Sequence, residues 1–114
     1  MKQILLIIIM LCTVTAYTAS YEECGKTDGI TSSGTKATDG ITASGIKATE
    51  NHTVACDFLK FGTQVVIMGQ TYTVEDRIGS SHPSKIDVFM ESKEEALKFG
   101  RRQLEVEILE GDDV

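Results

Sequence analysis

The sequence predicts a small, mostly β domain with one short helix before its last strand, and three observations support this prediction. β-Branched and apolar residues recur in short segments, several of which alternate apolar and polar side chains as half-buried strands do. Glycine-containing turns separate some of these segments. A single stretch near the C-terminus has the start and stop signals of a helix. At 114 residues the chain is expected to form one domain.

The first expected strand is Thr13–Ala19, which is β-branched and aromatic. The short apolar segment Thr53–Asp57 comes next. Gln64–Met68 and Thr71–Glu75 then flank Gly69-Gln70, and this pattern predicts a tight hairpin.

Two further strands alternate in a period of two. In Lys85–Met90 the aliphatic residues share one face, so Asp87 and Phe89 are expected on the other. Leu104–Ile108 alternates in the same way. Glu105 and Glu107 of this strand are expected to face solvent, and so is Glu75 at the end of Thr71–Glu75.

The helix is predicted from its ends. Ser92-Lys93-Glu94-Glu95 is a capping box, and Gly100 stands where a left-handed C-terminal cap belongs. Ala96, Leu97 and Phe99 supply an apolar stripe between them. A small β domain must also deal with unpaired strand edges, and closure into a barrel removes them. We therefore predict a small barrel, although the strand pattern alone is equally compatible with a sandwich.

The N-terminus has the features of an export signal. One lysine precedes the unbroken apolar run Ile4–Cys12, which is far shorter than the roughly 20 residues of a membrane-spanning helix. Small residues follow, so residues 1–16 are expected to act as a signal peptide cleaved before Tyr17, or as an uncleaved N-terminal anchor. The chain is thus expected to be secreted or associated with a cell envelope.

Charge and composition limit the partners. The net charge of −6, from 11 basic and 17 acidic residues, argues against nucleic acid, which needs clustered lysine and arginine. His52 and His82 are isolated, so no metal and no cofactor are expected. Cys24 and Cys56 pair in an oxidising compartment or remain unpaired; the sequence leaves both alternatives open. A monomer is expected.

A tandem duplication precedes the Thr53 strand. Residues 28–38 recur as residues 39–49 with nine of eleven positions identical. A unit this short cannot form a solenoid, so one copy is expected to form a surface loop, where insertions cost little. The second copy leads directly into the strand, and we therefore expect residues 28–38 to be the looped insertion.

Three aspartates, Asp57, Asp76 and Asp87, end or interrupt apolar segments. Burial of an ionised carboxylate without a partner is costly, so three such positions in one small domain suggest a shared site. At strand ends, aspartate commonly caps turns, which favours a structural role for Asp57 and Asp76 taken singly. Asp87 lies within a strand, where aspartate is disfavoured, and this favours a functional role.

Seven segments, taken in order, resemble the bacterial 3D domain, which is named for its three aspartates. They are Val14–Ala19, Gly40–Gly45, Thr53–Asp57, Phe61–Thr63, Val74–Asp76, Ile86–Val88 and Ala96–Arg102. The resemblance covers roughly residues 14–109. It departs from the family between the second and third aspartates, where Ile78–Lys85 replaces a Gly-Gly-x-Ile-Lys-Gly loop and Lys85 takes the place of the family lysine.

This family is similar to the catalytic domain of membrane-bound lytic transglycosylases and to stationary-phase survival proteins. The resemblance implies a six-stranded double-psi β-barrel and cleavage of the MurNAc–GlcNAc bond in peptidoglycan glycan strands, with one aspartate as both acid and base. By position, Asp87 is the expected acid and base, while Asp76 and Asp57 support it. The expected substrate contacts are Tyr17 (packing on a sugar face), Thr42, Ser44, Lys47 and Lys85.

Two alternatives belong to other classes. A non-catalytic module that binds or loosens the wall, similar in fold to expansins, would use the same groove. A degenerate prophage relic, whose duplication has disabled the groove, is the third interpretation.

Overall fold

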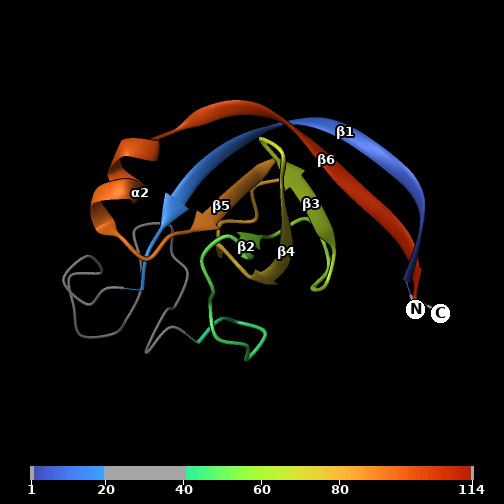
Figure 1. Cartoon of the computed structure of the whole chain (residues 1–114), viewed down its shortest axis with the longest axis horizontal. Coiled ribbons are helices and arrows are strands. Elements are labelled where there is room, and N and C mark those ends of the chain that lie inside the picture. Colours follow the sequence, from blue (N-terminus) through green and yellow to red (C-terminus); the bar gives the residue numbers. More distant parts are fainter. Residues whose placement is uncertain (1, 20–40, 114) are drawn as a thin grey trace.

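The computed structural model describes residues 2–19 and 41–113 (Figure 1). Six strands close into a barrel in the order β1-β5-β2-β4-β3-β6. Their bounds are β1 Lys2–Tyr17, β2 Thr53–Cys56, β3 Gln64–Ile67, β4 Gln70–Asp76, β5 Lys85–Phe89 and β6 Arg102–Asp113. The prediction of a six-stranded barrel is confirmed, and the sandwich is excluded because β6 pairs with β1 and closes the circle.

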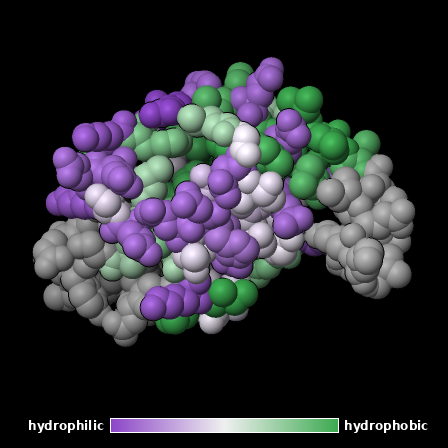
Figure 2. All heavy atoms as spheres, in the orientation of Figure 1, coloured by the Kyte–Doolittle hydropathy of each residue, from purple (hydrophilic) through white to green (hydrophobic). Residues whose placement is uncertain are grey.

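β1 and β6 form a long antiparallel ribbon that extends beyond the rest of the barrel (Figure 1). β1 begins at Lys2, so it includes the segment predicted to direct export as well as the strand expected from Thr13. Its last five residues, Thr13–Tyr17, pair in parallel with β5. Farther out the ribbon exposes aliphatic side chains, seen as green atoms in Figure 2; they are Leu6, Ile7, Ile8, Ile9 and Leu11, between 40% and 64% exposed.

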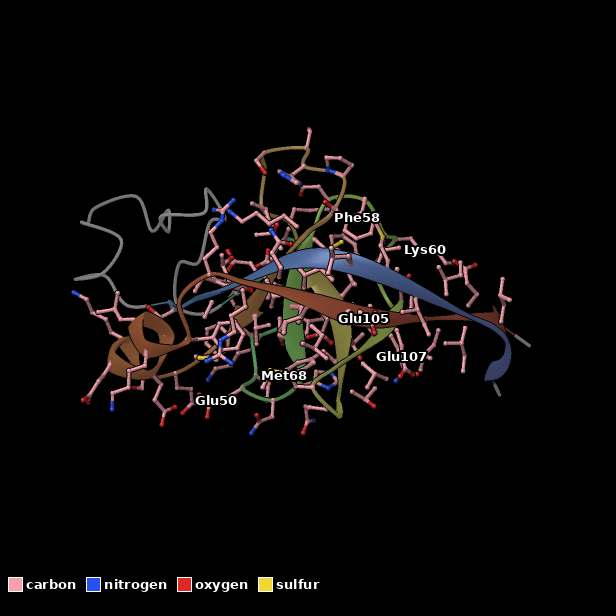
Figure 3. The ribbon with its side chains drawn as sticks, turned by 90° about the horizontal axis from the view of Figure 1, so that it is seen from above. Glu50, Phe58, Lys60, Met68, Glu105 and Glu107 are labelled. Atoms are coloured by element: carbon pink, nitrogen blue, oxygen red, sulfur yellow. The ribbon has the colours of Figure 1, made fainter. Side chains whose placement is uncertain are left out.

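The main core lies inside the barrel and follows the predicted alternation. Ile86 and Val88 of β5 point into it, whereas Phe89 packs into a second cluster outside with Tyr17, Ala55 and Ile78. In β6, Val106 and Ile108 are buried, and Glu105 and Glu107 are exposed (Figure 3). The sequence prediction for these two strands is confirmed.

The single α-helix among the described residues, α2, spans Lys93–Phe99 and lies directly before β6. The predicted N-terminal cap is present, because the Ser92 hydroxyl accepts a hydrogen bond from the Glu95 N–H at 3.2 Å. Gly100 ends the helix at a positive φ of 67°, which favours glycine, but its ψ of −143° lies outside the left-handed helical region that was predicted. The predicted apolar stripe is only partly correct, because Ala96 is buried but Leu97 is 68% exposed.

The hairpin turn between β3 and β4 lies one residue earlier than predicted. Ile67 pairs with Gln70, so the two turn residues are Met68 and Gly69. Both have positive φ, 52° and 80°, as a type I′ turn requires. The prediction of Gly69-Gln70 was wrong by one residue, because Met68 adopts positive φ and takes the first turn position while Gln70 begins β4.

Two cysteine thiols lie in the main core. Cys12 and Cys56 are both free and fully buried, so Cys56 behaves as an unpaired small hydrophobic residue; Cys24 lies outside the described residues. Within the described ranges, no helix has the length and apolar character needed to cross a membrane.

Candidate functional site

A row of side chains crosses four neighbouring strands on the outer face of the barrel wall. Thr15 on β1 pairs with Asp87 on β5, Asp87 pairs with Ala55 on β2, and Ala55 pairs with Asp76 on β4. Residues paired across a sheet point to the same face. Asp87 and Asp76 therefore lie on one face, separated only by Ala55.

Ala55 determines how closely the two aspartates approach. Neighbouring strands lie about 4.8 Å apart, so two strand spacings separate the backbones of Asp87 and Asp76 by about 10 Å. Ala55 between them is fully buried and has a single methyl group. Only this methyl group stands between the two aspartates, and burial and then the charge of Asp87 are the causes that raise the pKa of Asp76.

A β-bulge brings Asp76 into this row. Val54 pairs with Val74, but the next residue of β2, Ala55, pairs with Asp76, so β4 carries one extra residue at Glu75. Without the bulge, Glu75 would stand beside Ala55. Bulges of this kind re-aim side chains and occur often near functional sites.

Asp76 is 1% exposed and accepts three hydrogen bonds. The Tyr17 hydroxyl donates to Oδ2 at 2.8 Å, while the N–H groups of Ala43 and Arg77 donate to Oδ1 at 2.8 and 2.9 Å. Burial raises the pKa of Asp76 above its usual value, and the three donors partly offset this effect. Burial also raises the pKa of Tyr17 far above its ordinary range, so the phenol remains a donor.

Asp87 is fully buried within β5. Its Oδ1 accepts a hydrogen bond from the Thr15 hydroxyl at 2.8 Å, across the parallel β1–β5 pair. Burial and a neighbouring carboxylate both disfavour the charged form of a carboxyl group. The surroundings of Asp87 thus combine burial with a neighbouring carboxyl group, both of which disfavour its charged form.

The expected role of Tyr17 as a sugar-stacking residue does not fit this geometry. Tyr17 is 1% exposed, its hydroxyl is bound to Asp76, and its ring packs edge-on against Phe89 with the ring centroids 5.5 Å apart. A ring enclosed in this way cannot lie against a glycan. Tyr17 instead positions Asp76.

The described part of the second repeat copy forms a turn against the end of β4. The Thr42 hydroxyl donates to the Ile46 carbonyl at 2.6 Å and lies 3.0 Å from the Ser44 hydroxyl, and the Ser44 N–H donates to the Glu75 carbonyl at 3.2 Å. The expected substrate contacts Thr42 and Ser44 are therefore used to build this turn.

The second copy reaches the site through the Ala43 backbone, which sequence reasoning did not single out. The Ala43 N–H donates to Asp76, as described above. Lys47 is exposed, and its role as a substrate contact stays a prediction. The first copy, residues 28–38, lies outside the described residues.

Asp57 holds a loop. Its two oxygens accept hydrogen bonds from four successive backbone N–H groups at 2.7 to 3.1 Å; the donors are Ile78, Gly79, Ser80 and Ser81. Partial burial acts to raise the pKa of Asp57, but these donors outweigh it and lower the pKa below its usual value. Asp57 thus suits the turn-capping role that its strand-end position favours, rather than proton sharing with Asp76.

Glu75 is not an outward-facing residue, so that prediction was wrong. It is 7% exposed. The Thr53 hydroxyl donates to its Oε1 at 2.7 Å, and the His52 Nε2 lies 3.0 Å from its Oε2. The bulge turns Glu75 toward these polar groups, which explains why an acidic residue is tolerated there.

A pocket of about 310 Å³ opens beside Asp87, between β1, β5 and the end of α2. Besides Asp87, its polar lining consists of Thr15, Lys85 and Arg101. The apolar lining is Ala16, Ala96, Leu97 and Gly100. Of the expected site residues, the structure thus brings Lys85 and Asp87 together in one pocket, with Asp76 two strands away.

The described residues contain no group of three or more His, Cys, Asp or Glu side chains arranged to hold a metal ion.

Comparison with known proteins adds no identification: no protein-family model matches the chain, and a search of curated proteins finds no match.

Proposed function

We propose that this chain is a peptidoglycan lytic transglycosylase-like enzyme that cleaves the MurNAc–GlcNAc bond with Asp87 as its single acid and base. The observation that carries the proposal is a buried carboxyl group at a pocket, held by the Thr15 hydroxyl and close enough to a second carboxyl to influence it. The resemblance of the sequence to the 3D domain points to the same residue.

The reaction needs one proton carrier. Protonated Asp87 gives its proton to the glycosidic oxygen as the C1–O bond of N-acetylmuramic acid breaks. The 6-hydroxyl of the same sugar then attacks C1, and its proton passes to the Asp87 carboxylate. The products are a 1,6-anhydro sugar and a free 4-hydroxyl, water is not consumed, and Asp87 regains its proton.

Asp76 supports this cycle without touching the reacting atoms. Its carboxylate repels a negative charge on Asp87 and so favours the protonated form before turnover. Tyr17 and the Ala43 backbone hold Asp76 in place. Asp57 orders the loop after β4, which leads into β5 and hence into Asp87.

The test is digestion of purified peptidoglycan by the full chain in H₂¹⁸O, followed by mass spectrometry. We expect 1,6-anhydromuramyl products without ¹⁸O. Asp87→Asn is expected to lower the rate by about a hundredfold to ten-thousandfold, the usual value of general acid–base catalysis. Glu107→Gln, which neutralises an exposed acid on β6, is the matched control and should leave the rate unchanged.

Other results would point to other functions. Reducing-end products that carry ¹⁸O would mean a hydrolase. Retention on peptidoglycan without any cleavage would favour the module that binds or loosens the wall.

A further inference from the structure

The pocket beside Asp87 carries two positive charges in a chain whose net charge is −6. Lys85 is the first residue of β5 and stands two positions before Asp87, so its side chain leaves the same face about 7 Å along the strand. Arg101 follows Gly100, whose positive φ turns the chain from α2 toward β6. The two cations therefore come to the pocket from different elements.

Neither cation is neutralised within the described part of the chain. No ion pair or side-chain hydrogen bond of Lys85 or Arg101 occurs there. Two basic residues nearby do have partners. The Lys98 ammonium lies 3.8 Å from the Glu94 carboxylate. The Arg102 guanidinium donates a hydrogen bond to the Phe99 carbonyl and stacks on the Phe99 ring. The two cations at the pocket are thus available to a ligand.

The charges define the ligand chemistry. Arginine presents paired N–H groups that match a carboxylate in a bidentate manner, and lysine adds a point charge. An anion here would also lie near Asp87, and its charge would favour the protonated form of Asp87 that the proposed reaction needs before turnover.

The position of the charges limits where on the ligand the anion lies. Lys85 is about 7 Å from Asp87 along the strand, so the anion belongs to the sugar being cleaved or to its direct substituent. Muramic acid carries such a substituent, the lactyl group on O3. Its carboxyl group is a neutral amide when a stem peptide is attached and a free anion when the peptide has been removed.

We propose that Lys85 and Arg101 bind the free lactyl carboxylate of muramic acid, so that the enzyme acts on glycan strands stripped of their stem peptides. This inference rests on the proposed function. The pocket volume of about 310 Å³ agrees with it, because this is the lower end of the range for small-ligand pockets and suits a sugar ring without an attached peptide.

The test compares two substrates: glycan strands treated with an amidase that removes the stem peptides, and the same strands untreated. The native chain is expected to cleave the stripped strands about tenfold faster or more, the effect of one charge-assisted contact. Lys85→Gln and Arg101→Gln should each reduce this preference severalfold by slowing only the reaction on stripped strands. Lys98→Gln, on the exposed face of α2, is the control and should keep the native preference.

Equal rates on the two substrates, a preference for untreated strands, or variants that slow both reactions equally would overturn the inference and leave the proposed function standing. If neither substrate is cleaved, the proposed function fails, and retention on the two kinds of strand then tests the inference alone. Tighter retention on stripped strands that is lost in Lys85→Gln and Arg101→Gln supports carboxylate binding. Equal retention overturns it.

Discussion

Replacement of Thr15 by valine tests how Asp87 is held. Valine has the same shape and favours strands as threonine does, so β1 is expected to keep its pairing with β5. The change removes one group, the hydroxyl that donates to Asp87 Oδ1 at 2.8 Å. It leaves a fully buried carboxyl oxygen without that donor.

The magnitude follows from the burial of the acceptor. Loss of a hydrogen bond to a buried carboxyl group costs about 1–3 kcal/mol. We expect a loss of this size in the free energy of unfolding, measured by urea titration. Activity should also fall, by about tenfold, because a less well oriented acid adds on the order of 1.4 kcal/mol to the barrier.

Two further variants separate positioning from a general disturbance of the strand. Thr15→Ser keeps the hydroxyl and should retain most of the activity. Thr71→Val removes an exposed hydroxyl on β4 and should change neither quantity. If Thr15→Val retains native stability and activity, or if Thr15→Ser is as impaired as Thr15→Val, the hydroxyl does not position Asp87.

Three other predictions concern the fold. A chain that begins at Tyr17 lacks all of β1 except its last residue and should show no cooperative urea transition. A chain that begins at Cys12 keeps the β1–β5 pairing and should unfold cooperatively. A folded chain from Tyr17 would contradict the closure of the barrel by β1. Met68→Asn should raise the free energy of unfolding by up to about 1 kcal/mol, because asparagine tolerates positive φ, and a decrease would argue against the type I′ turn. The folded-state pKa of Asp57 is lowered, so its contribution to stability is complete above about pH 4 and is lost as the pH falls below that value. Thermal melts should therefore show a shallower acid decline in Asp57→Asn than in the native chain, and identical declines would refute this role.

Much of the fold could be predicted from local patterns. Around Val106, apolar residues alternate with polar ones because one face is packed and the other is exposed. In Lys85–Phe89 the alternation follows the pleat: Ile86 and Val88 pack inside the barrel, whereas Phe89 is buried in the cluster outside it. The helix end signals at Ser92 and Gly100 act within a few residues of their own position. Both kinds of signal are local in the sequence, so both were found.

The arrangement of the site depends on contacts that the sequence does not display. The bulge at Glu75 shifts Asp76 by one position, and nothing in the pattern of β4 marks it. Tyr17 was assigned to the surface because aromatic residues often contact sugars, whereas tertiary packing encloses it. The loop-holding role of Asp57 depends on a segment 21 to 24 residues later in the chain, and the Thr15 contact joins positions 72 residues apart.

The pairing of β1 with β6 joins the first strand of the chain to the last, since Lys2 stands opposite Asp113. Such a topology has a high contact order, which slows folding because the longest loop must close before the contacts form. The barrel cannot close until β6 has been synthesised. Until then β1 and β3 each keep one edge unpaired, because β6 pairs with both of them. Unpaired edges are the places where strands of other chains add, so the incomplete barrel is the form of this protein most prone to aggregate.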